Sequence, residues 1–212
     1  MNFLNIIFFI FLVGIFLFFS EFLKLKFSGI NKEFLRKIPH IFIGIIFAVL
    51  PYFLNKEEII FLAFMLTLGV ILNKFVKVFS AIFDIERFSV GVFLTPISLG
   101  ISAWYFLPQY PMAFSVGFLV LAFSDSFASM VGKLFQSKKI ISNISEKTYL
   151  GSFSCFIITF GIFFAGSLLK GDIFFVKVFL FSFMITVVEF FIIFGFDNIA
   201  IPFVSAYLFT LI

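Results

Sequence analysis

The sequence predicts an all-α fold, a polytopic membrane helical bundle of seven to eight transmembrane helices, which forms a single integral membrane domain over residues 1–212. Hydrophobic residues make up 63% of the 212 residues, 42 residues are phenylalanine, and the mean hydropathy is +1.24. Only 12% of the residues are charged, about half the share of a typical soluble domain. Charge this sparse cannot cover a globule in water, so lipid is the expected solvent.

Apolar runs long enough to cross a bilayer recur along the whole chain. The third run is short and has an alternative continuation along the membrane interface through "NKFVKVFSAIF"; the last run is also short and has a re-entrant alternative. No repeat, linker or soluble domain separates the runs. The first run lacks a basic leader and a small-residue cleavage site, so it is predicted to be a retained helix. The predicted spans are 3–23, 38–54, 59–73, 89–107, 112–134, 150–169, 174–195 and 199–212.

Most of the 15 basic residues fall on the loops after the first, third and fifth spans, which share one side of the membrane. The positive-inside rule makes that side cytoplasmic, and eight spans would place both termini outside. The net charge of +4 reflects this loop pattern, so no nucleic-acid partner is predicted. The basic residues on these loops are Lys24, Lys26, Lys32, Arg36, Lys37, Lys74, Lys77, Arg87, Lys133, Lys138, Lys139 and Lys147.

The motif "SDSFASMVGK" places a carboxylate, Asp125, within the fifth predicted span. An ionised aspartate near the centre of a membrane helix costs about 3 kcal/mol, so it is expected to face the interior of the bundle. Ala128, Ser129 and Gly132 follow it at helical spacing and form a small, polar face. A catalytic carboxylate is favoured over a structural one bonded between helices.

The motif "NISEKTYLGSFS" precedes the sixth span and combines a lysine, hydroxyl residues and a glycine. Ser145 or Thr148 can cap the helix that begins there. A helix N-terminus favours anions, and Lys147 adds a full positive charge, which suits a polyphosphate. The alternative is a topology signal with an ordinary helix cap.

Two further motifs carry charge at the same predicted face. "RKIPHIFIG" places Arg36 and Lys37 at the start of the second span and His40 one turn later, as a phosphate clamp or as snorkelling interfacial residues. "DIER" places Glu86 and Arg87 before the fourth span, where an interfacial ion pair of small effect is favoured.

The segment "VVEFFIIFGFDNIAIP" adds two carboxylates, Glu189 and Asp197, followed by Asn198. They are eight residues apart and would share a face on a continuous helix. With Asp125 they give three like charges in one apolar bundle, which predicts that a cation or a proton neutralises them, and oxygen ligands indicate Mg²⁺. The alternative is a turn before Pro202. A single histidine and one cysteine, Cys155, exclude a His/Cys zinc site and an intramolecular disulfide.

Taken in order, "RKIPH", "SDSFASMVGK", "SEKTYLGS" and "EFFIIFGFDNIAIP" resemble the CTP-dependent lipid-alcohol kinases. This family includes dolichol, polyprenol, phytol and farnesol kinases and the CTP-dependent diacylglycerol kinase. The resemblance covers residues 32–204. It implies phosphorylation of a long-chain lipid alcohol at the cytoplasmic face of the cell membrane, with CTP as co-substrate and Mg²⁺ as cofactor. The implied partners are a membrane lipid substrate and a nucleotide, and the oligomeric state is open, with a homodimer as one alternative.

The resemblance also assigns roles to individual residues. The implied catalytic residues are Asp125, Lys147, Arg36, Lys37 and His40; the nucleotide-binding residues are Gly132, Lys133, Thr148, Gly151, Ser152 and Asn198; and the metal ligands are Asp125, Glu189 and Asp197.

The chain departs from the family pattern at three positions. Leu150 stands where the family has a glutamate, and Ser124 and Ser126 flank the aspartate where the family tends to have glycine or proline.

Three alternatives remain open at this point. A CDP-diacylglycerol synthase-like cytidylyltransferase has a similar central section, but its C-terminal His-Gly-Gly and Asp-Arg signature is missing from this sequence. A small ion-coupled membrane carrier would also contain intramembrane carboxylates, although here they gather toward one face and no inverted repeat is visible. A membrane scaffold would not predict convergent charges.

Overall fold

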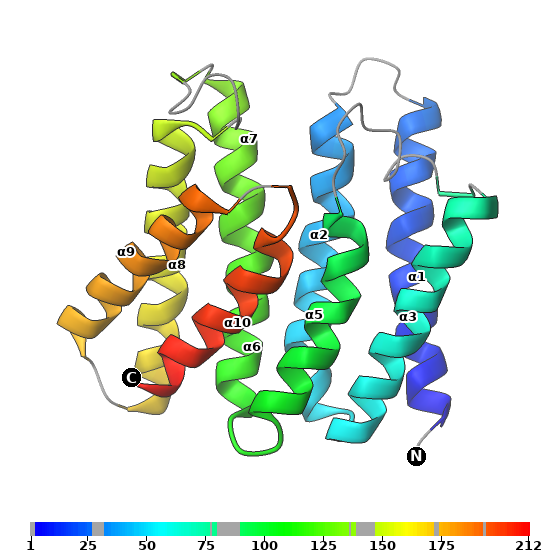
Figure 1. Cartoon of the computed structure of the whole chain (residues 1–212), viewed down its shortest axis with the longest axis horizontal. Coiled ribbons are helices and arrows are strands. Elements are labelled where there is room, and N and C mark those ends of the chain that lie inside the picture. Colours follow the sequence, from blue (N-terminus) through cyan, green and yellow to red (C-terminus); the bar gives the residue numbers. More distant parts are fainter. Residues whose placement is uncertain are drawn as a thin grey trace.

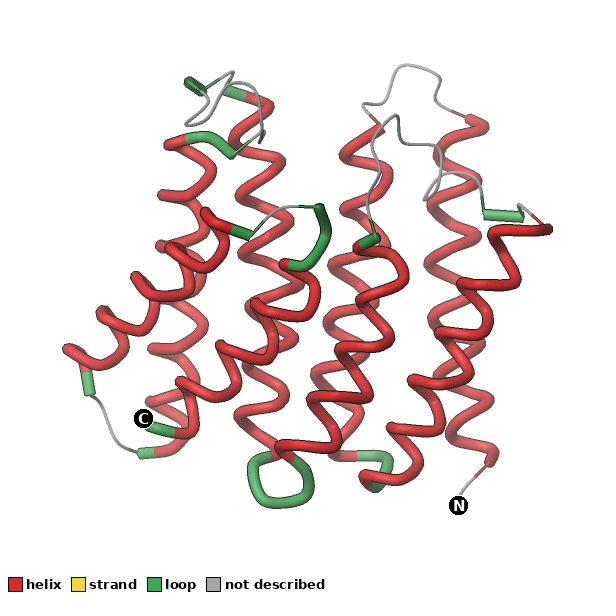
Figure 2. The backbone as a smooth tube through the Cα atoms, in the orientation of Figure 1, coloured by secondary structure: helices red, strands yellow, loops and turns green. Residues whose placement is uncertain are grey.

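A computed structural model describes residues 3–26, 32–76, 78–79, 90–135, 137–138, 147–171, 174–192 and 194–212. Every regular element in these ranges is a helix, which confirms the all-α prediction (Figures 1 and 2). Five helical segments in these ranges are long and apolar enough to cross a membrane, as expected of a membrane protein. They are Phe3–Lys26, Phe34–Tyr52, Lys56–Val76, Pro111–Leu134 and Tyr149–Lys170.

Each of the eight predicted ranges overlaps a helix or helical segments joined end to end. In chain order the elements are α1 (Phe3–Lys26), α2 (Lys32–Val49) with η1 (Leu50–Tyr52), α3 (Lys56–Val76), α5 (Gly91–Phe106), α6 (Pro111–Val120), η2 (Leu121–Asp125), α7 (Ser126–Leu134), α8 (Tyr149–Lys170), α9 (Phe175–Phe191) and α10 (Asp197–Thr210).

The third and seventh spans differ from the prediction. The third is not short, because α3 has 21 residues; of its expected interfacial continuation, residues 73–83, the first four belong to α3, and 77 and 80–83 lie outside the described ranges. The seventh ends early, because α9 stops at Phe191. Beyond it the backbone of Phe194 and Gly195 is left-handed, with φ of 61° and 92°, which an α-helix does not accommodate. Glu189 and Asp197 therefore lie on separate helices, and they do not share a face of one continuous helix.

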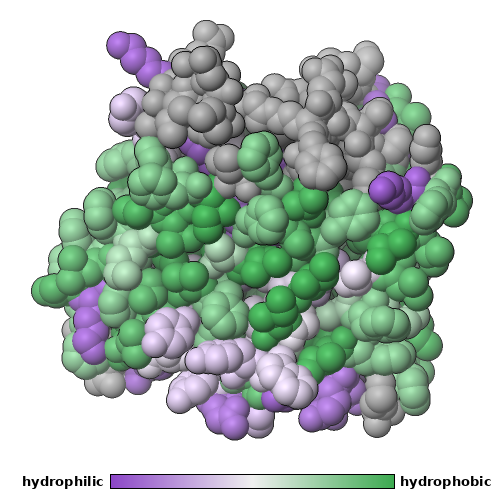
Figure 3. All heavy atoms as spheres, in the orientation of Figure 1, coloured by the Kyte–Doolittle hydropathy of each residue, from purple (hydrophilic) through white to green (hydrophobic). Residues whose placement is uncertain are grey.

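The central rod of the bundle is formed by α6, η2 and α7, which run end to end and are the most buried of the long segments. α10 packs against α6 and α5, α8 packs against α7 and α9, and α2 covers α6 and η2. Both termini lie at the same end of the bundle, opposite the upper ends of α2, α7 and α8 (Figure 1). A broad apolar band crosses the face seen in Figure 3 and would face lipid.

The three basic residues outside the loops named above, Lys56, Lys170 and Lys177, lie over aromatic rings. The ammonium nitrogen of Lys56 is 4.7 Å from the ring centre of Trp104, and that of Lys170 is 5.0 Å from the ring centre of Phe209. The ammonium nitrogen of Lys177 is 4.5 Å from the ring centre of Phe174. Such cation–π contacts keep a charged head near the membrane interface while the stem covers apolar surface.

One close helix contact in the centre of the bundle depends on a glycine. A side-chain carbon at Gly117, on α6, would overlap the carbonyl oxygen of Pro202 on α10. Small residues at such crossings let two membrane helices approach closely, because lipid supplies no hydrophobic force between them. Gly69, on α3, has open space around it.

This difference predicts opposite effects of the same substitution. We expect Gly117→Ala to lower the free energy of unfolding by about 1–3 kcal/mol, because α10 must move to admit the methyl group. Gly69→Ala should leave stability unchanged or raise it by about 0.5–1 kcal/mol through helix propensity. Thermal unfolding in detergent measures both, and equal stability of the two variants would contradict the close α6–α10 contact.

Candidate active site

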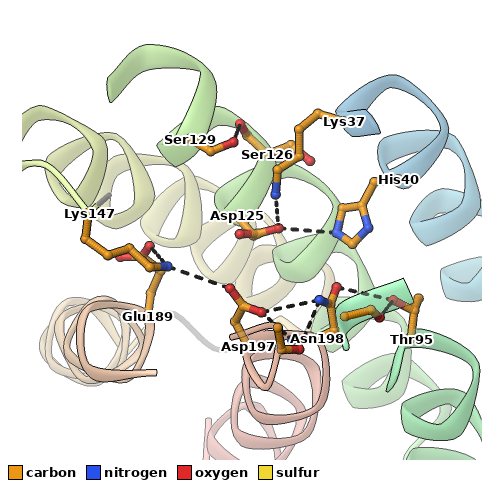
Figure 4. A network of polar contacts seen from close by, with 12 residues as sticks. Lys37, His40, Thr95, Asp125, Ser126, Ser129, Lys147, Glu189, Asp197 and Asn198 are labelled. Carbon is orange, nitrogen blue, oxygen red and sulfur yellow. Dashed lines mark hydrogen bonds and ion pairs between the residues drawn. The ribbon is translucent and has the colours of Figure 1, made fainter. Parts of the chain in front are cut away.

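Charged side chains from five segments of the chain meet in one network of polar contacts (Figure 4). α2 supplies Lys37 and His40, and the end of η2 supplies Asp125. Lys147 directly precedes Thr148, which is the N-cap of α8. The remaining residues of the group, from α9 and the start of α10, are Glu189, Asp197 and Asn198.

One half of the site is built around Asp125. Its Oδ2 atom accepts a hydrogen bond from the ammonium of Lys37 and lies 3.4 Å from Nε2 of His40. Both side chains reach it because they are three residues apart on α2, so they share a helix face, as the sequence predicts. Only 3% of Lys37 and 5% of Asp125 is exposed, so the carboxylate faces the interior and its charge is balanced there.

The backbone at Asp125 is not the plain α-helix that the sequence predicts. Residues Leu121–Asp125 form a π-helical turn between α6 and α7. Such turns insert one extra residue into a helix and are frequent at functional sites. Beyond the turn, Ala128 and Gly132 are buried on the face that begins with Asp125, while Phe127 is exposed, so the predicted polar face is confirmed.

The other half of the site is built around Lys147. Its ammonium donates a hydrogen bond to Oε1 of Glu189 and lies 3.7 Å from Oδ2 of Asp197. Ser152, on the first turn of α8, is 3.4 Å from the second oxygen of Glu189. Lys147 thus joins the start of α8 to the end of α9 and the start of α10.

Lys147 remains protonated at neutral pH. Burial by itself would lower its pKa, but the negative charges of Glu189, Asp197 and Asp125 outweigh burial and raise the pKa above the ordinary lysine value. A permanent cation at this position can hold either a carboxylate or a phosphate oxygen.

The two halves act on each other electrostatically. Asp197 feels the charges of Asp125, Lys37 and Arg36 as well as that of Lys147. Arg36 is partly buried on α2, next to Lys37 in sequence. The three carboxylates are therefore matched in number by three cationic side chains, with His40 as a further titratable group.

The first turn of α8, predicted to bind phosphate through its N–H groups, already has partners for them. Thr148 caps the helix, because its hydroxyl accepts from N–H of Gly151 at 3.1 Å. N–H of Leu150 donates to Oγ of Ser137, and N–H of Tyr149 donates to the carbonyl of Lys138. Side chains rather than backbone N–H groups are thus the available phosphate ligands at this end.

The two predicted glycines of this region serve helix packing. A side-chain carbon at Gly132 would overlap the hydroxyl of Thr148, and one at Gly151 would come within 2.6 Å of the carbonyl oxygen of Ala128. α7 and the start of α8 therefore approach each other closely, and the groups that leave no room for a side chain at these two glycines belong to the protein itself.

The structure adds two residues that the sequence analysis does not identify as candidates. Thr95, on α5, places its hydroxyl 3.3 Å from Oδ1 of Asn198, next to Asp197 (Figure 4). Ser126 is fully buried beside Asp125, and its hydroxyl has no hydrogen-bond partner among the described residues. A lone threonine or serine in an apolar run carries no sequence signal, because both residues pack commonly inside membrane helices.

Some predicted residues lie outside the buried group or cannot be placed. Lys133 is exposed in the last turn of α7. Five residues fall outside the described ranges: Lys77, Glu86, Arg87, Lys139 and Ser145.

The donor chemistry of Asp125, Glu189 and Asp197 suits a hard cation such as Mg²⁺. In this structure, however, each carboxylate faces a lysine, and no group of three or more His, Cys, Asp or Glu side chains in the described ranges lies close enough to hold a metal ion. The ammonium of Lys147 lies between Glu189 and Asp197, where a shared cation would bind. The predicted common metal cluster is therefore not formed in this arrangement.

Comparisons of the chain with protein-family models, with curated proteins and with solved structures find no match.

The buried pair of Lys37 and Asp125 predicts strong coupling between two substitutions. Lys37→Met alone leaves an unpaired carboxylate in the bundle and should destabilise the protein by about 3–5 kcal/mol. Adding Asp125→Asn removes that charge and should restore part of the stability. Unfolding of the wild type, both single variants and the double variant completes the cycle, and additive losses would show that the two side chains do not interact.

Proposed function

We propose that this protein is a lipid-alcohol kinase of seven or eight membrane spans, which transfers the γ-phosphoryl group of CTP to the hydroxyl of a membrane lipid at the cytoplasmic face. The resemblance to the CTP-dependent lipid-alcohol kinases suggests the reaction and the nucleotide. The observation that carries the proposal is the gathering of three carboxylates, two lysines and a histidine from separate helices at one end of an apolar bundle.

This grouping needs a function because burying charge in a membrane protein is costly. Intramembrane ionisable residues generally mark a functional site. Here both signs of charge are present in equal number, and they lie at one end of the helices. A complex of a metal ion with a polyphosphate also carries both positive and negative charge. It suits such a site because the carboxylates can pair with the metal ion and the cationic side chains with the phosphates.

In the proposed reaction the hydroxyl oxygen of the lipid attacks the γ-phosphorus, and the bond from that phosphorus to the β-phosphate oxygen breaks. CDP leaves, and the hydroxyl proton passes to His40, beside Asp125. Lys37, Lys147 and Arg36 stabilise the negative charge on the phosphates, and the free hydroxyl of Ser126 is a further donor. Positioning and charge stabilisation are the main requirements of such a transfer.

Mg²⁺ would be held by Asp125, Glu189 and Asp197 and would neutralise charge on the β- and γ-phosphates. For these carboxylates to become available, Lys37 and Lys147 must turn from them to the phosphates.

Labelled nucleotides distinguish this proposal from the alternatives. Purified protein with γ-labelled CTP, Mg²⁺ and a panel of lipid alcohols should give a labelled lipid monophosphate on thin-layer plates, with CDP as co-product. Transfer of an α-label with release of pyrophosphate would instead indicate a cytidylyltransferase. Neither product from folded protein would indicate a carrier or a scaffold.

Two substitutions test the assigned residues. Asp125→Asn and Lys147→Met should each lower kcat by about 100-fold or more, because each removes a charge that acts on the reacting groups. Lys170→Met, at the opposite end of α8, is the matched control and should keep activity. A wild-type rate in the Asp125→Asn variant would show that this residue takes no part in the reaction.

The proposed orientation is tested by thiol labelling in a Cys155→Ala background, since the native cysteine is fully buried. An impermeant reagent added to intact cells should label Gln109→Cys, between α5 and α6, and should label Lys138→Cys, on the basic side, only after permeabilisation. The reverse pattern would place the candidate site outside the cell.

A further inference from the structure

Two buried hydroxyl groups join the central rod to α8 beside the candidate site. The hydroxyl of Ser124, in η2, lies 2.9 Å from that of Thr159, near the middle of α8, and neither side chain is exposed. Several other helix hydroxyls of this chain bond a preceding carbonyl of their own helix, as those of Thr67, Ser182 and Thr186 do. The bond between Ser124 and Thr159 instead connects two helices.

The surroundings of this hydroxyl pair make the bond costly to break. The thiol of Cys155, one turn earlier on α8, lies 4.0 Å from the hydroxyl of Thr159 and is a weaker partner. Leu121 and Ala122, in the same turn as Ser124, are fully buried and apolar. A buried hydroxyl that loses its partner in such surroundings is left unsatisfied. The pair therefore opposes any rotation of η2 relative to α8.

The π-turn that carries Ser124 is held from two sides. η2 contacts both α2 and α8, and the central rod lies between these two helices in Figure 1. On the α2 side, a side-chain carbon at Gly44 would come within 2.6 Å of the side-chain carbon of Ala122, so the backbone of α2 lies directly against the turn. On the α8 side, Thr159 holds Ser124. π-helical turns are rare, so the neighbours of this one are expected to stabilise it.

Ser124 and Asp125 are adjacent in sequence but contact different helices. Whereas Ser124 bonds α8, Oδ2 of Asp125 accepts a hydrogen bond from Lys37 and lies 3.4 Å from Nε2 of His40, both on α2. Successive side chains of a helical turn point roughly 90° apart, so fixing one of them also fixes the direction of the next. A rotation that released Ser124 from α8 would carry Asp125 away from Lys37 and His40.

We propose that Ser124 and Thr159 are positioning residues, whose hydrogen bond fixes the rotation of the π-turn and thereby holds Asp125 against Lys37 and His40. Ser124 is one of the positions at which the chain departs from the lipid-alcohol kinase pattern, so the resemblance assigns it no role. The positioning of Asp125 is argued from the geometry alone, and its effect on the rate of phosphate transfer rests on the proposed kinase function.

The single histidine of the chain gives a direct readout of this geometry. Full-length protein is prepared without a histidine tag, with a nitrogen isotope in its histidine, and is placed in phosphatidylcholine nanodiscs for magnetic resonance. Asp125→Asn removes the negative charge beside Nε2 and defines the signal of His40 without it. Thr159→Val removes the hydroxyl and keeps the shape, and should shift the His40 signal toward that of Asp125→Asn. Ser124→Ala should give the same shift.

Two matched variants separate the hydrogen bond from general loosening of the bundle. Thr159→Ser keeps the hydroxyl and should restore the wild-type His40 signal. Thr67→Val, on α3, removes a hydroxyl that bonds its own helix and should leave the signal unchanged. A wild-type signal in either Thr159→Val or Ser124→Ala would overturn the positioning role. An equal shift in Thr67→Val, or no recovery in Thr159→Ser, would do the same.

The same variants have a kinetic readout. Thr159→Val and Ser124→Ala should each lower kcat by about tenfold or more with little change in KM for CTP, because a small misplacement of a reacting group slows the reaction strongly. Thr159→Ser should recover most of the rate. Since the resonance measurement needs no CTP, a His40 shift in protein that transfers no phosphate would refute the kinase proposal and keep the positioning role. Phosphate transfer without that shift in the variants would refute only the positioning role.

Discussion

The requirement that every buried charge has a partner determines how this bundle is arranged around its site. Asp125 is neutralised by Lys37 of α2, and Glu189 and Asp197 share Lys147. Each of these contacts joins different helices. Since lipid provides no hydrophobic force between helices, ion pairs and close glycine contacts decide which membrane helices are neighbours. The same contacts that could prepare a catalytic site therefore also stabilise the positions of α2, α7, α8, α9 and α10.

Much of the fold follows from composition and from the lengths of the apolar runs, and the failures have clear causes. The division between the seventh and eighth spans is predicted, but the early end of α9 at Phe191 has no signal in hydrophobicity, because residues 192–196 are as apolar as the helix before them and a single glycine is common in membrane helices. The π-turn at Leu121–Asp125 is hidden for the same reason: it leaves the hydrophobic pattern intact and changes only the hydrogen-bond ladder.

The sequence also identifies most residues of the candidate site, but not their partners. Asp125, Glu189 and Asp197 are predicted to share a cation, whereas each faces a lysine. The start of α8 is predicted to offer N–H groups, whereas Ser137, Lys138 and Thr148 accept them. Partner choice depends on which helices become neighbours, and periodicity within a single span does not contain that information. Thr95 is missed for the same reason, because only its contact with Asn198 distinguishes it from other threonines in apolar runs.

The order of the ion-pair partners along the chain bears on how the protein is made. Ribosomes deliver the N-terminal helices first, so Lys37 is already in the membrane when Asp125 is inserted, and that carboxylate meets its counter-charge at once. Lys147, by contrast, is synthesised before both Glu189 and Asp197. Its half of the charge network closes only when the last two helices arrive, so a nascent chain that stalls after α8 leaves Lys147 without Glu189 and Asp197.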